Sequence, residues 1–459
     1  MTQEIHRPQA GPVRETVEVP LTVGQSSLFF IHELDPGSTT YNMAVAFTIR
    51  EEFDPDRLRD SWAAVCSRHS VLTGVVRPGT DGYVQHWYSA EPPLTTREAP
   101  GVDADALSRM LHQDYESPFA LKKEAPARLF LYRHTGASTL LLMVHHMVGD
   151  LTSMAAVCED LLTGYRTGVT GELPEPDSSY ARYVAHERTF LDSARSEPMR
   201  RYWADRLDGC AFALDIPGAA ASTSAADSPA LARFTLPRGP ADGVRRVAEA
   251  SGTSTATVLL AAFNVLLHRL TGSSDIVVGF PVEGRKKPFK RTVGYFVNSL
   301  PLRVGVAPED GFPAVLSATH SALVGAVRHQ AIPIPAVLSD ISPAVTRAIH
   351  QVSFQFEPER LSYGARMHVG GLGTVRLFGE EAEFVPIRQQ IGQFPLWMQI
   401  GEVEGALQGG LHFDPERFGI ENATGYVRMY EALVRDIVDG ETTGVSAWGA
   451  DTGGPGRPT

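Results

Sequence analysis

The chain has 459 residues, more than one hydrophobic core usually holds, which predicts two or more lobes. Its composition, 43% hydrophobic and 20% charged, excludes a largely disordered protein. The formal net charge of -12 argues against wholesale binding to nucleic acid, because neutralising phosphates needs a basic surface. We therefore expect a globular protein of several lobes with no nucleic-acid partner.

The cysteines and the apolar stretches indicate a cytoplasmic protein. Cys66, Cys158 and Cys210 show no CxxC spacing, which fits neither a disulfide framework nor a zinc cluster. The opening residues lack the apolar core of a signal peptide. The longest apolar stretch, near residues 256–270, is shorter than the roughly 20 residues that span a bilayer. We expect a soluble protein of a reducing compartment with no membrane partner.

Strand and helix patterns alternate from residue 20 to about residue 166. Residues 41–49 alternate apolar and polar side chains, which predicts a strand. Asp54 then caps a predicted helix with one apolar face. Residues 129–132 and 139–144 predict a hairpin, and its second strand is apolar at consecutive positions, as a strand buried on both faces would be.

Residues 167–179 are rich in Gly and Pro and lack periodicity, so they form the best candidate boundary. We predict one charged amphipathic helix over residues 180–207 and a low-complexity loop over residues 218–229. Strand and helix patterns then alternate again. Helices are predicted at 255–270, 312–329 and 415–438, and strands at 276–280, 299–304, 352–356 and 396–400.

Two α/β lobes follow from this pattern. We expect a flexible arm over residues 1–19, an N-terminal lobe over 20–175, a C-terminal lobe over 176–440 and a disordered tail over 441–459.

One segment, HHMVGDL from His145 to Leu151, combines groups that perform acid–base chemistry. Two histidines end a buried strand, where α/β folds commonly place reactive groups, and Asp150 follows after a short turn. A neutral imidazole in this position accepts a proton near pH 7. Because neighbouring residues on a strand point to opposite faces, His145 and His146 are expected to have different roles.

Structural interpretations of this segment stay open on the residues alone. A His-His pair at a strand end is more often structural than catalytic, and Asp150 also suits the N-cap of the following helix. A metal site is disfavoured, because adjacent histidines on opposite faces chelate poorly. The segment therefore indicates acid–base chemistry without naming a reaction.

HHMVGDL resembles the HHxxxDG signature of the condensation domains of nonribosomal peptide synthetases, in the chloramphenicol-acetyltransferase-like superfamily. Other segments resemble further motifs of this family in the same order. They are PLTVGQSSLF from Pro20, YNM from Tyr41, RHSVL from Arg68, GFPVEGR from Gly279, VGYFVNSLPLR from Val293, HQAIP from His329 and QVSFQFE from Gln351. The resemblance extends over residues 20–440 and implies two acetyltransferase-like lobes in a V-shaped pseudo-dimer with the active-site tunnel between them.

The resemblance implies an acyltransferase of natural-product biosynthesis. Such an enzyme moves an acyl or aminoacyl group from a donor carrier-protein thioester to an amine, or to a hydroxyl, on an acceptor carrier protein or a soluble acceptor. The substrates ride on phosphopantetheine arms, and the protein itself binds no cofactor and no metal. We expect a free-standing, monomeric protein that acts in trans. The alternative is a non-catalytic, condensation-like module that docks carrier proteins.

The site residues follow from the resemblance by position. His146 is identified as the catalytic histidine, and His145 is expected to be mainly structural. Asp150 resembles the residue that pairs with the arginine of the second-lobe motif, here Arg285. The residues expected to line the tunnel are Gly149, Leu151 and Asn298.

Two positions depart from the family pattern. Leu151 replaces the last glycine of the signature, which predicts a narrower tunnel, an unusual acceptor or reduced activity. Thr73 stands in place of the second arginine of RHExLR, which predicts the loss of one charge contact. Both histidines are present, whereas a heterocyclisation domain carries aspartates there. TVGYFVNSLP from Thr292 follows the condensation form and not the epimerisation form.

Residues 285–291, RKKPFKR, are the densest basic segment and the best candidate for docking an acidic carrier protein. A solvated loop is an equally good interpretation of the same residues.

Overall fold

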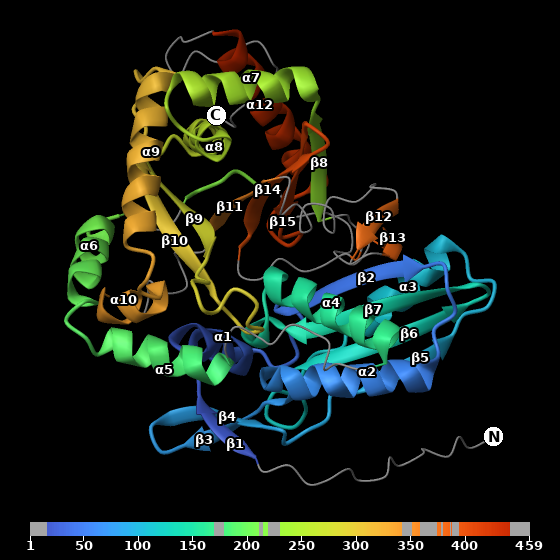
Figure 1. Ribbon diagram of the computed structural model, residues 1–459. Helices are drawn as coiled ribbons and strands as arrows, with labels where there is room; N and C mark the ends of the chain where they lie inside the picture. Colours follow the sequence, from blue (N-terminus) through green and yellow to red (C-terminus); the bar gives the residue numbers. More distant parts are fainter. Residues whose placement is uncertain are drawn as a thin grey trace.

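The structure is a computed structural model that describes residues 16–168, 179–210, 214–218, 230–341, 351–358, 374–377, 380–385, 387 and 394–440. Two six-stranded mixed sheets carry the helices, and a small three-stranded sheet lies beside the first of them (Figure 1). Most of the predicted boundary segment, nearly all of the predicted low-complexity loop, and the predicted C-terminal tail lie outside the described residues.

The first sheet has the strand order β12-β13-β2-β7-β6-β5. Its strands from the first half of the chain are β2 (Asn42–Ile49), β5 (Leu94–Glu98), β6 (Ala127–His134) and β7 (Ala137–His145). The predicted hairpin is β6–β7, an antiparallel pair with Arg133 opposite Ser138. Every residue of β7 from Ser138 onward is buried, which agrees with the consecutive apolar residues of this central strand.

Three helices pack on this sheet: α2 (Pro55–Arg68), α3 (Ala104–Tyr115) and α4 (Leu151–Thr167). The predicted N-cap of α2 is present, since Asp54 accepts hydrogen bonds from the backbone N–H groups of Asp56 and Arg57. A short 3-10 turn, η1 (Ser70–Thr73), follows α2, and a second, η2 (His146–Val148), joins β7 to α4.

The predicted flexible arm overlaps a β-strand. Residues 17–19, expected in a flexible arm, lie in β1 (Val17–Pro20), which pairs with β4 (Gly82–Trp87), and β4 pairs in turn with β3 (Val75–Gly79). A capping box between Thr22 and Gln25 then starts α1 (Val23–Leu34). Residues 1–15 of the predicted arm lie outside the described residues.

The second sheet has the strand order β10-β9-β11-β14-β15-β8. Its strands are β8 (Leu231–Leu236), β9 (Asp275–Glu283), β10 (Val297–Gly305), β11 (Val352–Glu357), β14 (Leu396–Val403) and β15 (Ala406–Phe413). The helices of this lobe are α7 (Arg238–Ala250), α8 (Thr255–Thr271), α9 (Phe312–Arg328), α10 (Ile334–Ile341) and α12 (Ile420–Asp439). Every residue of α8 from Thr257 to His268 is buried, as a helix that is apolar on nearly all sides requires.

Two strands from the second half of the chain, neither of them expected from the sequence, join the first sheet. They are β12 (Thr374–Leu377) and β13 (Glu380–Phe384). β13 pairs with β2, with Ala382 opposite Ile49, so the hairpin extends the sheet of the N-terminal lobe (Figure 1). Their short, charged sequences carry little hydrophobic periodicity, which is why no strand was expected there.

The single helix predicted over residues 180–207 is wrong. The structure has two helices, α5 (Tyr180–Leu191) and α6 (Glu197–Leu207). Pro198 lies in the first turn of α6, and it has no N–H to donate to Ala194. A continuous helix would also place its ring against that carbonyl, so the chain turns at Ser193–Ser196 before it starts again.

Among the described residues, no single helix is long and apolar enough to cross a bilayer. The pair α7 and α8 passes such a test of length and composition together, but the two helices are bent by 101°.

The buried apolar residues form two clusters, one in each lobe. The connection between β9 and β10 belongs to the second lobe in sequence, yet its residues Phe289, Val293 and Phe296 are part of the first cluster. This connection therefore brings the residues around Arg285 against the turn that follows β7.

Candidate active site

The turn after β7 holds His146 in one orientation. The backbone N–H of His146 donates to Tyr41 O at 2.8 Å, which fixes the start of the turn. Its ring Nδ1 lies 2.7 Å from Gly149 O, and since a carbonyl only accepts, Nδ1 carries the proton. The neutral ring therefore has its lone pair on Nε2, the form that accepts a proton or a hydrogen bond from a substrate.

Burial lowers the pKa of His146, while the hydrogen bond to Gly149 and the charge of Asp150 act in the opposite direction. The ring stays neutral at pH 7 for this reason.

His145 is turned into the first lobe and is 2% exposed. Its Nδ1 accepts a hydrogen bond from the backbone N–H of Met147 at 3.2 Å. The rings of His32, Tyr41 and Phe119 surround it, with centroids 5.3 to 6.2 Å away. Burial, and then the neighbouring histidines, lowers the pKa of His145 well below its usual value, so this ring acts as a neutral packing group.

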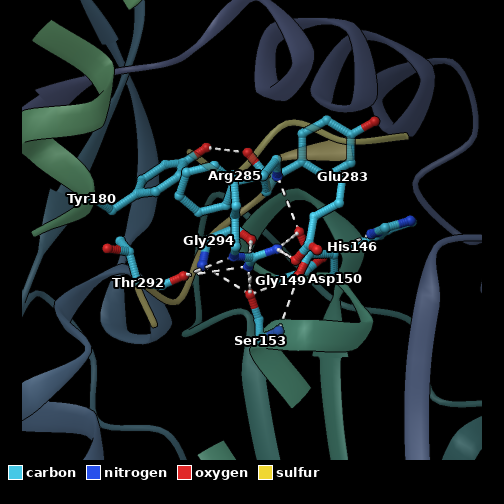
Figure 2. A network of polar contacts seen from close by, with 11 residues as sticks. His146, Gly149, Asp150, Ser153, Tyr180, Glu283, Arg285, Thr292 and Gly294 are labelled. Carbon is cyan, nitrogen blue, oxygen red and sulfur yellow. Dashed lines mark hydrogen bonds and ion pairs between the residues drawn. The ribbon is translucent and has the colours of Figure 1, made fainter. Parts of the chain in front are cut away.

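Asp150 and Arg285, expected to pair, lie in contact (Figure 2). One terminal nitrogen of Arg285 donates to Asp150 Oδ2 at 2.6 Å, and both side chains are almost fully buried. The other carboxylate oxygen, Oδ1, accepts from the backbone N–H of Ser153 at 3.0 Å, which makes Asp150 the N-cap of α4. Asp150 therefore combines the two roles that the sequence left open, and it fixes the position of α4 relative to the second lobe.

Arg285 has several further partners. It donates to Glu283 Oε1 at 3.0 Å and to the carbonyl of Thr292, and its guanidinium lies 4.3 Å from the ring centroid of Phe296. A guanidinium stripped of water needs most of its N–H groups satisfied, and these contacts supply acceptors for them.

Ser153 is a site residue that was not expected from the sequence. Its hydroxyl accepts from Arg285 at 2.7 Å and from the backbone N–H of Gly294 at 3.0 Å. It also lies within 3.0 Å of Asp150 Oδ1 and of Gly294 O, either of which can take its hydrogen. The spacing Asp-x-x-Ser at a helix start is the only signal in the sequence, and it is common at capped helices.

The β9–β10 connection is held against α5 by close packing. A Cβ at Gly294 would lie 2.1 Å from the Tyr180 ring, so only glycine fits there. The Tyr180 hydroxyl donates to Tyr295 O at 2.9 Å (Figure 2). These contacts direct the Tyr295 ring toward His146, edge to face at 5.2 Å. Tyr295 was also missed, because 149 positions separate it from His146 in the chain.

The three residues expected to line the tunnel have different surroundings. Gly149 supplies the carbonyl that orients His146, and a Cβ there would lie 3.3 Å from Val144. Leu151 is the first residue of α4 and is partly exposed. Asn298 lines a cavity, but its amide is bound to backbone groups: it donates to Gln330 O and Ile332 O and accepts from Ile334 N.

Thr73 fills the position of the missing arginine with a structural contact. Its hydroxyl donates to Ser70 O at 2.8 Å and accepts from the backbone N–H of Tyr88 at 2.7 Å. Two other residues of that segment, Arg68 and His69, both contact the buried Asp160. Arg291 reaches the same carboxylate from the second lobe.

In the part of the chain that the structure describes, no cluster of three or more His, Cys, Asp or Glu side chains is arranged to hold a metal.

Two sheet-based lobes, with a histidine at a strand end of the first and a brace from the second, define a protein of the chloramphenicol-acetyltransferase-like fold. The chain belongs to the condensation-domain family, whose model matches residues 15–448. The expected α/β fold of two acetyltransferase-like lobes is thereby confirmed. Condensation domains generally form amide bonds between substrates carried on phosphopantetheine arms of carrier proteins.

The chain is 30% identical over 360 residues to the phosphinothricin tripeptide synthetase PhsC of Streptomyces viridochromogenes, covering 74% of this chain and 33% of that protein. It is 26% identical over 458 residues to a probable non-canonical nonribosomal peptide synthetase, CymA, of Salinispora arenicola, covering 95% of this chain and 6% of that protein. The chain thus spans a third or less of the length of these relatives.

Solved structures share the fold at low sequence identity. The first condensation domain of the calcium-dependent antibiotic synthetase, in complex with a substrate analogue, matches with a TM-score of 0.74 and 21% identity over 95% of this chain and 99% of that chain. The X-domain from teicoplanin biosynthesis matches with a TM-score of 0.80 and 20% identity over 97% and 99%.

Proposed function

We propose that this chain transfers an acyl or aminoacyl group from a carrier-protein thioester to an amine acceptor, and that His146 acts at the reacting atoms. The observation that carries the proposal is the fixed Nδ1–Gly149 hydrogen bond, which leaves Nε2 of a neutral ring available. A group with a lowered pKa remains in the proton-accepting form at neutral pH.

The reaction needs no nucleophile from the protein. The acceptor nitrogen forms a bond to the thioester carbonyl carbon and passes a proton to His146 Nε2. The C–S bond then breaks, and the leaving phosphopantetheine thiolate takes the proton from His146 Nε2. This transfer restores the neutral ring. An oriented amine gains chiefly from proximity, and the histidine adds proton transfer or hydrogen bonding to the same step. A hydroxyl acceptor would give an ester by the same sequence.

The test uses the purified chain with separate, acyl-loaded carrier proteins and a panel of amines and alcohols, with products read by mass spectrometry. His146→Ala should lower transfer by at least about 100-fold, since positioned general acid–base groups contribute about 10² to 10⁴. The matched control is His320→Ala on α9, a partly exposed histidine distant in sequence from the motif, which should leave the rate unchanged.

The non-catalytic alternative predicts a different result in the same assay. A module that only docks carriers would bind the loaded carrier but release no product above the background of His146→Ala. Undiminished transfer by His146→Ala would remove this residue from the mechanism while leaving the acyltransferase assignment intact.

A further inference from the structure

A cavity of about 600 Å³ lies between α5, α6, the beginning of the β9–β10 connection and the turn before α10. It is distinct from the turn of His146, which does not contribute to its wall. The volume is in the range of sites for small organic ligands, about 300–1,000 Å³.

The wall of the cavity is largely apolar and aromatic. Phe190 and Met199 come from the two helices, and Phe289 comes from the β9–β10 connection. Tyr183 packs edge to face against Phe289 with centroids 5.4 Å apart. Since Asn298 has its amide committed to backbone groups, it adds little polar recognition. These surfaces suit a ligand with a flat aromatic or an aliphatic part.

The rim of the cavity is cationic. Lys286 and Lys287 come from the β9–β10 connection and Arg195 from the turn before α6, and all three are exposed lining residues. Among the described residues none of the three has an ion pair, whereas Arg291 of the same basic segment is paired with Glu159 at 3.0 Å. Three unpaired cations around one opening favour an anionic group there.

Glu187 is the one acidic residue of the wall, and it does not cancel this charge. It is buried, and its Oε1 accepts a hydrogen bond from the backbone N–H of Val23 at 2.8 Å. Burial raises the pKa of Glu187 to about 7, so its carboxyl is largely protonated in mildly acidic solution. The cavity therefore retains a net positive rim over an apolar interior.

We propose that this cavity binds a small organic acid, with its carboxylate or phosphate on Lys286 and Lys287 and its apolar body against Phe289 and Tyr183. The wall of this site includes no residue of the His146 turn, so the proposal does not rest on the proposed acyl-transfer function. The basic segment that the sequence marked as a docking patch thereby gains a specific structural role as the rim of a ligand site.

The test is a titration of the intact chain with 2-naphthylacetate and with its uncharged counterpart 2-naphthylacetamide, by calorimetry at pH 6.5. The acid should bind about tenfold more tightly than the amide, because a charge-assisted hydrogen bond exceeds a neutral one. The variant Lys286→Gln/Lys287→Gln should lose this preference. The matched control, Lys290→Gln, removes an exposed charge of the same segment that does not line the cavity and should bind as the unmodified chain does.

Two more measurements keep the outcome decisive. Ala331→Phe places a ring in the cavity and should abolish binding of both probes without lowering the melting temperature. His146→Ala should bind both probes normally, which separates this site from the proposed catalytic one. Equal affinity for acid and amide, no binding at millimolar probe, or binding only of a carrier protein bearing its phosphopantetheine arm would overturn the proposal.

Discussion

At the scale of single residues, the chemistry of the site depends on which nitrogen of His146 carries the proton. The contact with Gly149 O places the proton on Nδ1, so Nε2 keeps the lone pair. The edge-to-face contact with Tyr295 limits rotation of the ring out of this orientation. Gly149 and Tyr295 thus position the group that would act on a substrate.

This geometry predicts the pH dependence of acyl transfer. The neutral ring is the reactive form, so activity is present above the pKa of His146 and is lost as the pH falls through it. Because burial lowers this pKa, the acid limb of the kcat/KM profile should lie below the ordinary histidine value of 6.5. A profile measured with a loaded carrier, alongside thermal melts at each pH to detect unfolding, provides the check. An acid limb at or above 6.5 would contradict the assignment.

The buried pair of Asp150 and Arg285 predicts a large loss of stability when one partner is removed. Asp150→Ala should cost about 3–5 kcal/mol in the free energy of unfolding, because it leaves a buried guanidinium without its carboxylate. Urea denaturation measures this cost. Arg201→Ala, which breaks the exposed pair with Glu197, is the control and should cost less than about 1 kcal/mol. Equal losses in the free energy of unfolding for the two variants would show that the buried pair contributes no more to stability than the exposed pair.

At the scale of elements, the β9–β10 connection does most to assemble the site. It starts on a strand of the second lobe, supplies Arg285, and buries Phe289, Val293 and Phe296 in the first core. Its backbone then meets α5 at Gly294 and α4 at Ser153. The segment is therefore a link between the lobes as well as the support of the turn that holds His146.

The close approach of Gly294 to Tyr180 gives a test of this link. Gly294→Ala should destabilise the chain by about 1–3 kcal/mol, since its Cβ would overlap the ring. Combined with Tyr180→Ala, which removes the obstacle, the loss should be less than the sum of the single losses by about 1–3 kcal/mol.

Gly239→Ala in α7 is the control, because nothing lies within 4 Å of a Cβ there, and it should be neutral or slightly stabilising. If the losses of stability from Gly294→Ala and Tyr180→Ala were strictly additive, the β9–β10 connection would not lie against the Tyr180 ring as the structure shows.

The elements of the site differ in how far the sequence reveals them. β7, the turn and α4 are consecutive, and their hydrophobic pattern and capping residue are local, so they were predicted from the residues alone. The approach of Ser153 to Gly294 joins positions 141 residues apart, and no local pattern encodes it. The pairing of Asp150 with Arg285 was inferred only because a family motif supplied the distant partner. Pro198 is a local signal for the break between α5 and α6. The charged amphipathic pattern of residues 180–207 nevertheless led to the prediction of one continuous helix.

At the scale of the whole molecule, the two lobes are not independent stretches of chain. The first core takes residues from the second half through the β9–β10 connection, and the first sheet takes β13. A division of the sequence at one boundary describes most of each lobe. It misses these two segments, which follow the boundary in sequence but pack on the first lobe. Both segments are short and have weak hydrophobic periodicity, so periodicity cannot predict this part of the architecture.

Removal of the β12–β13 hairpin tests its role at the edge of the first sheet. β13 covers the edge of β2, whose backbone N–H and C=O groups would otherwise be open to another chain. Replacing residues 374–385 with a Gly-Ser linker of equal length should increase higher-order species in light scattering after size-exclusion chromatography. Glu381→Ser/Glu383→Ser keeps the backbone pairing, changes only exposed side chains of β13, and should match the unmodified chain. Identical size distributions for all three proteins would mean that β13 does not protect this edge.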